Sequence, residues 1–387
     1  MYKRLFVAAR KHYFIFGPRS VGKSTWLKQE YVRRTLYINL LKTSEHLRYA
    51  QHPELIHEMV ATGQYRHVII DEIQRMPHLL NDVHDLIADQ GDKIQFVLTG
   101  SSSRKLKKAD TNLLAGRAVT RYFYPLVAPE YSYHPRDLDN ILKFGTLPDV
   151  RKQAHEKDQG EILEAYTDTY LKEEIKEEAL VRKLEPFVRF LTVAALMNGQ
   201  KLNLSNIARD AAVKRTAVDG HFEILRDTLI CHALPAWKMK ARVKEVAGPK
   251  LYFFDTGVVR ALAGRIYAPL DSAEKGFLFE TMMINEIRAY LSYASRKGKL
   301  SYWGTPAGSE VDLIYSFNGK NIGMEFKSAP RWRAEFSAPL AELLQEKVLT
   351  RACAVYGGKE MLVSHGVTVY PPDRFLDALW SHQILDL

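Results

Sequence analysis

The stretch Gly17-Pro18-Arg19-Ser20-Val21-Gly22-Lys23-Ser24 lies between an apolar run, Tyr13–Phe16, and a segment of helical composition that begins at Thr25. It fits the pattern G-x-x-x-x-G-K-[ST], in which glycines let the backbone turn its N–H groups toward a phosphate. The N-terminus of the following helix adds its positive end at the same place. The stretch therefore predicts a phosphate-binding loop that extends to Thr25. Lys23 would reach the β- and γ-phosphates, and the Ser24 hydroxyl would bind Mg²⁺.

Two carboxylates follow another apolar run, Val68-Ile69-Ile70. Asp71 in this place would hold Mg²⁺ through water, and Glu72 would orient and deprotonate the attacking water. A later run ends in Thr99-Gly100-Ser101-Ser102, where the Thr99 hydroxyl can sense the γ-phosphate. The loop and the carboxylates together predict an ATPase whose cofactors are ATP and Mg²⁺.

An arginine near the end of this region is a candidate for a further catalytic role. Phosphoryl transfer is assisted by a cation on the γ-phosphate, which a neighbouring subunit often supplies. Arg117, in Leu113-Leu114-Ala115-Gly116-Arg117, fits this role and would imply a homo-oligomer; Arg121 lies nearby. An ordinary solvated arginine remains the alternative.

Composition sets broad limits on the rest. Of the 387 residues, 46% are hydrophobic and 26% charged, which is typical of a folded protein. The N-terminus shows neither a signal peptide nor a membrane-spanning run, and Cys231 and Cys353 stand far apart, so we expect a cytoplasmic protein with reduced thiols and no membrane partner. The net charge of +10 favours contact with nucleic acid, although many basic proteins bind none.

The middle of the chain has features of a DNA-binding segment. Leu204–Arg209 and Arg215–Leu225 have the rhythm of a helix-turn-helix. In Lys238-Met239-Lys240-Ala241-Arg242-Val243-Lys244 every second residue is basic, so a strand would place the four cations on one face. This is typical of the wing of a winged-helix domain, where aligned cations suit a phosphate backbone. An edge strand protected by lysines is the alternative.

A second set of carboxylates lies in the last third of the chain. Glu280 falls within the apolar stripe Phe277, Ile284, Ile287, Leu291 of a predicted helix, so it must be paired, protonated or metal-bound. Glu310 and Asp312 share one face of a predicted strand, and Glu325 and Lys327 share one face of the next. A helical Glu, an Asp and a Glu-x-Lys are typical of metal-dependent nucleases, in which carboxylates hold Mg²⁺ and a lysine stabilises developing charge. Glu280, Asp312 and Glu325 are thus candidate metal ligands, with Lys327 beside them.

The whole chain resembles a family of prokaryotic ATPases. The resemblance rests on Gly17–Ser24, Ile70-Asp71-Glu72-Ile73-Gln74, Leu98–Ser102, Ala115-Gly116-Arg117, Leu251-Tyr252-Phe253-Phe254-Asp255-Thr256-Gly257, Phe279-Glu280, Glu310-Val311-Asp312 and Glu325-Phe326-Lys327. In that family an AAA-type P-loop domain precedes a winged-helix segment and a C-terminal domain of unknown function with a restriction-endonuclease-like (PD-(D/E)XK) fold. The resemblance implies ATP binding and work on DNA.

These observations predict an α/β protein in three parts. Residues 1–135 would form an AAA-type P-loop NTPase domain with a parallel sheet, residues 136–262 a helical and winged-helix domain, and residues 263–387 a restriction-endonuclease-like α/β domain. Two functions remain open: an ATPase whose nucleotide cycle controls a DNA-binding and DNA-cleaving half, or an ATP-dependent switch or scaffold whose nuclease-like domain is catalytically idle and binds a protein.

Overall fold

The computed structural model describes residues 2–102, 114, 116–171, 184–238 and 248–386, without the side chains of residues 170 and 171. The chain divides into two compact units. The first unit is Lys3–Pro125 with Ile224–Ile230, and the second unit is Leu126–Glu223 with Cys231–Leu387. Each unit is described separately below.

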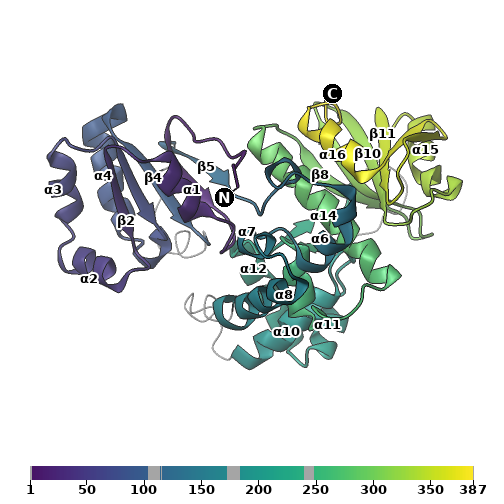
Figure 1. Cartoon of the computed structure of the whole chain (residues 1–387), viewed down its shortest axis with the longest axis horizontal. Coiled ribbons are helices and arrows are strands. Elements are labelled where there is room, and N and C mark those ends of the chain that lie inside the picture. Colours follow the sequence, from purple (N-terminus) through teal and green to yellow (C-terminus); the bar gives the residue numbers. More distant parts are fainter. Residues whose placement is uncertain (1, 103–113, 115, 172–183, 239–247, 387) are drawn as a thin grey trace. The chain divides into compact units, whose positions relative to one another are not determined.

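The first unit is built on a five-stranded sheet in the order β2-β3-β4-β1-β5 (Figure 1). Every pairing in it is parallel. Its strands are β1 (His12–Phe16), β2 (Thr35–Asn39), β3 (His67–Asp71), β4 (Gln95–Gly100) and β5 (Ala118–Tyr122). The helices are α1 (Lys23–Glu30), α2 (Thr43–Gln51), α3 (Leu55–Ala61) and α4 (Leu79–Gln90), with 3₁₀ turns η1 (Ile73–Arg75) and η2 (Gly91–Lys93).

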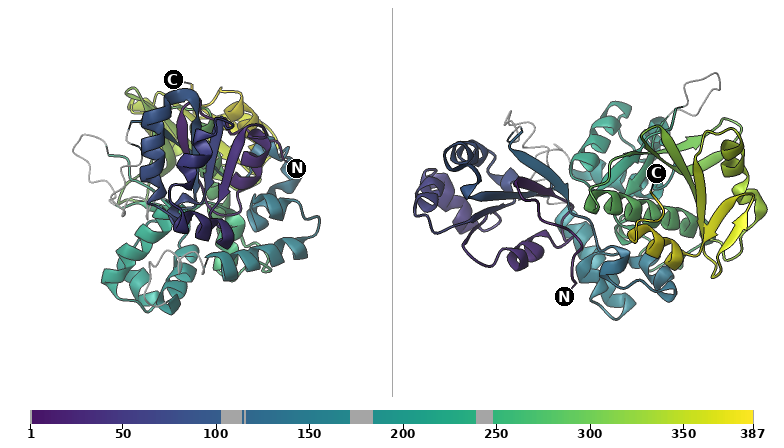
Figure 2. Two further views of the ribbon diagram at one scale, coloured as in Figure 1. Left: turned by 90° about the vertical axis from the view of Figure 1, so that its left-hand side faces the viewer. Right: turned by 90° about the horizontal axis from the view of Figure 1, so that it is seen from above.

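The apolar content of the central strands explains this arrangement. β1, β3 and β4 are almost wholly buried, which requires cover on both faces of the sheet. Helices lie on both faces (Figure 2). On one side Phe14, Ile70 and Leu98 pack with Leu79 and Val83 of α4 in a common core.

The second unit begins with a helical region. It contains η3 (Ala128–Glu130), η4 (Pro135–Asp137), α6 (Leu138–Phe144), α7 (Pro148–Arg151), α8 (Glu156–Ala165), a π-helical turn η5 (Tyr166–Leu171), α10 (Leu184–Leu196), α11 (Leu204–Asp210), most of α12 (Arg215–Asp227) and α13 (Thr256–Leu262). Residues 224–227 at the end of α12 belong to the first unit. Two antiparallel strands, β6 (Cys231–Leu234) and β7 (Lys250–Phe253), form a small separate sheet.

A mixed six-stranded sheet completes the second unit, in the order β12-β13-β11-β10-β9-β8. Its elements are α14 (Ser272–Tyr293), β8 (Lys299–Gly304), β9 (Glu310–Phe317), β10 (Lys320–Lys327), η6 (Ala334–Ser337), α15 (Ala338–Gln345), β11 (Arg351–Tyr356), β12 (Leu362–Ser364), β13 (Val367–Tyr370) and α16 (Pro372–Trp380). Leu340 and Leu343 of α15 pack on one face. Phe375 of α16 meets Phe326 on the other face. The helices α15 and α16 are labelled in Figure 1.

The predicted fold class is confirmed: a parallel-sheet N-terminal domain, a helical region and a C-terminal mixed sheet. One detail of the predicted long helix is wrong. Phe277 was expected in the buried stripe of α14 but is 37% exposed. The sequence predicts that this helix begins at Gly276, but it begins earlier, at Ser272, because the Asp271 carboxylate accepts the Glu274 N–H and caps it.

Candidate functional site

The predicted phosphate-binding loop connects the end of β1 to the start of α1. Gly17 passes so close to β5 that a Cβ there would lie 2.3 Å from the Phe123 carbonyl oxygen, so the position requires glycine. The Lys23 ammonium folds back and donates to the carbonyls of Gly17 (2.6 Å) and Pro18 (2.9 Å). All of α1 is described, and it has neither a side-chain cap nor an acidic residue in its first turn. No carboxylate of its own first turn therefore opposes an anion at the positive end of this helix.

Asp71 lies beside the loop at the end of β3. Its Oδ2 accepts a hydrogen bond from the Tyr37 hydroxyl of β2 at 2.6 Å, and its Oδ1 accepts one from Thr99 of β4. Tyr37 also shares a side-chain hydrogen bond with Ser24. Burial raises the pKa of Tyr37 well above its usual range, so this hydroxyl stays protonated and can donate.

Ser24 and Asp71 thus contact the same phenolic hydroxyl. A hydroxyl and a carboxylate next to the phosphate loop are the oxygen donors that Mg²⁺ takes in nucleotide sites. The residues fit the predicted ATPase magnesium site. Sequence reasoning missed Tyr37, and an aromatic residue within the strand run Thr35–Asn39 gave no signal for this role.

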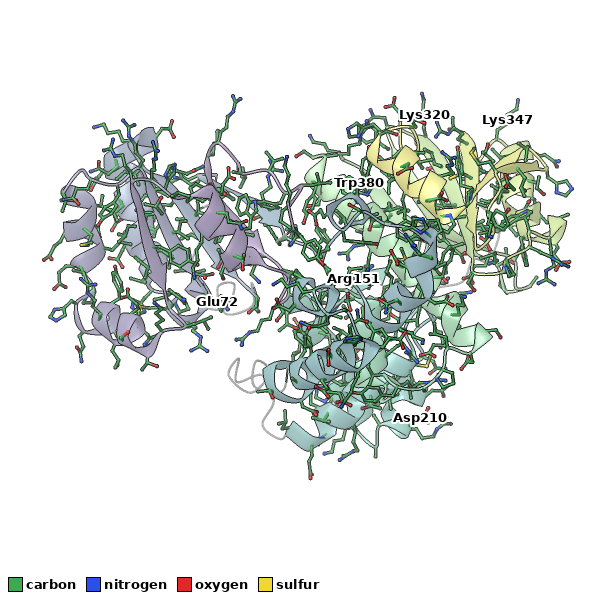
Figure 3. The ribbon with its side chains drawn as sticks, viewed as in Figure 1. Glu72, Arg151, Asp210, Lys320, Lys347 and Trp380 are labelled. Carbon is green, nitrogen blue, oxygen red and sulfur yellow. The ribbon has the colours of Figure 1, made fainter. Side chains whose placement is uncertain are left out.

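Glu72, labelled in Figure 3, follows Asp71. Its backbone is in a left-handed conformation, with φ of 63°. Its side chain is buried, and Gln74 Nε2 donates to Glu72 Oε2. Gln74 Nε2 also lies 3.1 Å from the Ser101 hydroxyl, which is 3.4 Å from the same Glu72 oxygen. A non-glycine residue at positive φ costs about 1–3 kcal/mol and persists where its surroundings impose it. Gln74 and Ser101 therefore fix the direction of this carboxylate.

Thr99 joins the two acidic residues. Its hydroxyl donates to Asp71 and accepts the Glu72 backbone N–H at 3.1 Å. Contact of Thr99 with a γ-phosphate stays a prediction.

Arg117 lies at the N-terminal ends of the parallel strands, whereas the phosphate loop lies at their C-terminal ends. It directly precedes Ala118, which pairs with His12 at the start of β1, whereas the phosphate loop follows the end of β1. The Arg117 side chain is exposed and donates to the His84 carbonyl at 3.1 Å. An arginine that serves the nucleotide of a neighbouring subunit needs such an exposed position away from its own loop, but this role stays a prediction. Leu113 and Ala115 of the motif lie outside the described residues.

The middle region has the predicted pair of short helices. α11 and α12 flank a turn, and Ile207 and Ala208 of α11 are buried. Arg215 lies at the start of the second helix, as expected. It forms an ion pair with Asp219 at 2.7 Å, which partly offsets the positive charge that Arg215 presents to DNA. Of the predicted basic strand, Lys238 is exposed, while Met239, Lys240, Ala241, Arg242, Val243 and Lys244 lie outside the described residues.

The C-terminal carboxylates come together where β9 and β10 meet. Asp312 lies opposite Glu325 by the register that pairs Leu313 with Met324. The Phe326 N–H donates to Asp312 Oδ2 at 2.9 Å, and the Asp312 N–H donates to Glu325 Oε2 at 3.3 Å. Lys327 Nζ forms an ion pair with Glu325 and lies 3.7 Å from Asp312 Oδ2.

Glu280 of α14 reaches the same cluster through a lysine that the sequence reasoning had not singled out. Lys250 Nζ, from β7, lies 2.9 Å from Glu280 Oε1, 2.5 Å from Glu310 Oε1 and 3.8 Å from Asp312 Oδ1. Tyr252 donates to Glu280 Oε1 at 2.5 Å. The one signal in the sequence was a lysine at the start of the apolar run Leu251–Phe254.

The electrostatics of this cluster follow from burial and mutual charge. Burial works to lower the pKa of Lys250, but the charges of Glu280, Asp312 and Glu310 outweigh it and raise the pKa above its usual value. Burial, followed by the charge of Asp312, raises the pKa of Glu280 above its usual range. The same two causes raise the pKa of Glu325.

A divalent metal ion does not fit the cluster as it stands. Within the described residues, no three His, Cys, Asp or Glu side chains are grouped so that they could hold a metal together. The Lys250 ammonium lies among the oxygens that would have to bind the ion. Of the three carboxylates predicted as metal ligands, Glu280 and Asp312 therefore lie around Lys250, whereas Glu325 pairs with Lys327.

The run Leu251–Gly257 has a structural role in this fold. Asp255 caps α13 by accepting the Val258 N–H at 3.1 Å and also accepts the Thr146 N–H at 2.7 Å. A Cβ on Gly257 would lie 2.2 Å from the Phe144 carbonyl oxygen, so glycine permits α13 to pack on α6. Burial raises the pKa of Asp255 to about 6.

Comparison with known families divides the chain into three matches. Residues 9–132 match the family described as AAA domain. This segment is thus similar to AAA domains. Residues 135–267 match the Domain of unknown function (DUF8612), and residues 275–374 match the Domain of unknown function (DUF4143).

Individual relatives are distant. An uncharacterized protein of Mycobacterium tuberculosis is 25% identical over 315 residues, which span 80% of this chain and 69% of the relative. Among solved structures, domain III of the Thermotoga maritima replication initiation protein DnaA is 17% identical, with a TM-score of 0.24 over 33% of this chain and 61% of that chain. The Thermotoga maritima RuvB Holliday junction branch migration motor is 17% identical, with a TM-score of 0.28 over 58% of this chain and 82% of that chain.

Within the described part of the chain, no helix has both the length and the apolar composition needed to cross a membrane.

Proposed function

We propose that the AAA-type P-loop domain binds and hydrolyses Mg·ATP. The observation that carries this proposal is the convergence of three groups at one edge of the parallel sheet. Lys23 points into the loop, Ser24 and Asp71 contact a common hydroxyl, and Glu72 is held by Gln74.

Each group then has a defined task. The loop N–H groups and the Lys23 ammonium bind the β- and γ-phosphates, for which Lys23 exchanges its two carbonyl partners for phosphate oxygens. Ser24 and Asp71 hold Mg²⁺, which neutralises charge on the phosphates. The Glu72 carboxylate orients the attacking water and accepts its proton.

A nucleotide-binding assay tests the proposal most directly. Lys23→Ala should weaken ATP binding as well as turnover, because the ammonium contacts the phosphates before and during the reaction. Lys93→Ala is a matched control in the same unit, since Lys93 is exposed in η2. Equal ATP affinity in Lys23→Ala and the control would remove the phosphate-binding role of the loop.

We further propose that the helical region binds duplex DNA. α10, α11 and α12 precede the antiparallel pair β6 and β7, an element order that supports a winged helix, and residues 235–249 connect the two strands. Replacing Lys238, Lys240, Arg242 and Lys244 together should lower both DNA affinity and its salt dependence, by up to ~0.9 in log–log slope per lost phosphate contact. An unchanged slope would show that these side chains do not meet the phosphates.

The C-terminal domain is either a DNA-cleaving domain or a catalytically idle nuclease-like domain. The position of Lys250 favours the idle domain. An ammonium among the carboxylates supplies the positive charge that a nuclease takes from metal. In this alternative the whole protein is an ATP-dependent switch or scaffold, and its idle nuclease-like domain binds a protein partner. Nicking of supercoiled plasmid with Mg²⁺ or Mn²⁺ separates the two functions: cleavage that Asp312→Asn abolishes would establish the nuclease.

A further inference from the structure

Lys250 is one of the most deeply buried charged side chains in the second unit. Its side chain is 4% exposed, and those of Glu280 and Asp312 are 9% and 7% exposed. A lone ammonium at such depth would lose most of its hydration, and so would each carboxylate. The ammonium and the two carboxylates therefore remain charged at this depth only because they form ion pairs with one another.

The backbone fixes the position of this ammonium. Lys250 opens β7, which pairs with β6, and its own backbone forms a bridge to Lys201. Its Nζ lies 5.4 Å from the centre of the Tyr302 ring, whose hydroxyl donates to the Gly248 carbonyl at 2.6 Å. Lys250 therefore enters the cluster from a strand that is held on both sides.

The charges of the cluster nearly balance without any added ion. Four carboxylates are present, Glu280, Glu310, Asp312 and Glu325, and three ammonium groups, Lys201, Lys250 and Lys327. Lys201 Nζ lies 2.6 Å from Glu310 Oε2, so each lysine is paired with at least one of these acids. With all four carboxylates ionised, four negative and three positive charges leave one negative charge, whereas the same cluster without Lys250 would carry two.

An ammonium and a divalent ion compete for the same space here. Mg²⁺ and Mn²⁺ require several oxygens at about 2.0–2.2 Å in octahedral geometry. Glu280 Oε1, Glu310 Oε1 and Asp312 Oδ1 instead surround Lys250 Nζ at 2.5–3.8 Å. An ion that drew these oxygens in would have to displace the ammonium.

We propose that Lys250 is a built-in cation that takes the place of a divalent metal in the C-terminal carboxylate cluster, so that the native cluster binds no Mg²⁺ or Mn²⁺ and becomes a divalent-cation site once the ammonium is removed. The cluster then serves to join β7 to α14 and β9 through Glu280, Glu310 and Asp312. This proposal is independent of ATP hydrolysis in the first unit.

The test uses the full chain without nucleotide and Mn²⁺ as the probe. Lys250→Met keeps most of the stem but removes the charge, and Lys152→Met is the matched control because Lys152 forms an exposed pair with Asp149 in the same unit. Lys250→Met should melt lower than the native protein in EDTA. It should bind one more Mn²⁺ per chain than the native protein by titration, with recovery of roughly 5 °C or more in melting temperature at saturating Mn²⁺. The double variant Lys250→Met, Asp312→Asn should lose both gains.

Each other outcome overturns the proposal. Mn²⁺ binding by the native protein that Asp312→Asn removes would show that the metal displaces the lysine. Folded Lys250→Met protein with no added Mn²⁺ site would show that the ammonium does not stand in for a metal. If Lys250→Met does not fold in EDTA, refolding upon Mn²⁺ addition supports the proposal; failure of both Lys250→Met and Lys250→Gln to fold with Mn²⁺ rejects it.

Discussion

The two acidic sites of this chain differ in what surrounds them. Asp71 and Glu72 are held by neutral groups: the hydroxyls of Tyr37 and Thr99 and the amide of Gln74. The C-terminal carboxylates are held by the ammonium groups of Lys250 and Lys327.

The difference concerns where the positive charge comes from. Neutral donors orient a carboxylate and leave its charge available to a cation that arrives with the substrate. Ammonium groups neutralise the carboxylate within the folded chain, so little attraction for an arriving cation remains. We therefore expect the first site to bind cations that arrive from outside the chain, such as Mg²⁺. We expect the second site to hold β7, α14 and β9 together.

The largest expected effect is on the ATPase rate, when the arginine that a neighbouring subunit would supply to the first site is removed. If Arg117 acts on the nucleotide of a neighbouring subunit, Arg117→Ala should lower the ATPase rate by about 10³-fold, the lower range for such arginines. Mixing Arg117→Ala with Lys23→Ala protein should restore part of the activity, because one mixed interface carries both intact groups. No recovery in mixtures that are shown to co-assemble would end this assignment.

A smaller effect is expected when the same chemical change is made at both sites. Glu72→Gln should retain ATP binding but lose a factor of roughly 10² or more in hydrolysis, because the positioned base is gone. Asp312→Asn should leave ATP hydrolysis nearly unchanged and lower the melting temperature of the second unit. Hydrolysis at the native rate by Glu72→Gln would refute its role as the base.

Glu286 offers a third case, buried in the second unit with N–H donors as partners. Its Oε1 accepts the Ala128 N–H and the Trp380 indole N–H, both at 2.7 Å (Figure 3 labels Trp380). Burial raises the pKa of Glu286 from 4.5 to about 7. The folded state thus binds this proton more tightly than the unfolded state, so its contribution to stability is complete below about pH 4.5 and is lost as the pH rises through 7.

Glu286→Gln should remove this pH dependence, since an amide oxygen can accept the same two hydrogen bonds. At pH 8 the variant should be more stable than the native protein by about 3 kcal/mol, because the pKa shift from 4.5 to about 7 corresponds to 1.36 kcal/mol per pKa unit. Below pH 5 the two proteins should melt alike. A native protein whose melting temperature stays level from pH 5 to 8 would contradict the shifted pKa.

The smallest expected effect tests the neutral partners of the first site. Tyr37→Phe removes one hydrogen bond to Asp71 and one to Ser24, each worth about 1 kcal/mol. The Mg²⁺ concentration for half-maximal ATPase activity should rise several-fold, with little change in ATP affinity. Tyr13→Phe is the control, because the Tyr13 hydroxyl pairs with Tyr31. A larger effect in the control than in Tyr37→Phe would exclude a role of Tyr37 in magnesium binding.

The sequence alone determined most of the first unit. Its strands are nearly continuous apolar runs, and the loop and carboxylates stand at strand ends, where parallel strands place them at one edge of the sheet. Local spacing suffices for such features, so Gly17–Ser24, Asp71 and Glu72 were found before the structure. The assignment of their roles, and the three-part division at residues 135 and 262, remain predictions.

Only the tertiary structure decided which side chains pair with the buried carboxylates. For Glu280 the sequence left pairing, protonation and metal binding open, and the structure selects pairing with Lys250, 30 positions earlier in the chain. Tyr37 likewise reaches Asp71 across 34 positions. Periodicity shows that a charge is buried but carries no information about its partner, because that partner is set by how strands and helices pack. The physical reason is that burial follows from a local pattern, whereas compensation of a buried charge depends on contacts between distant segments.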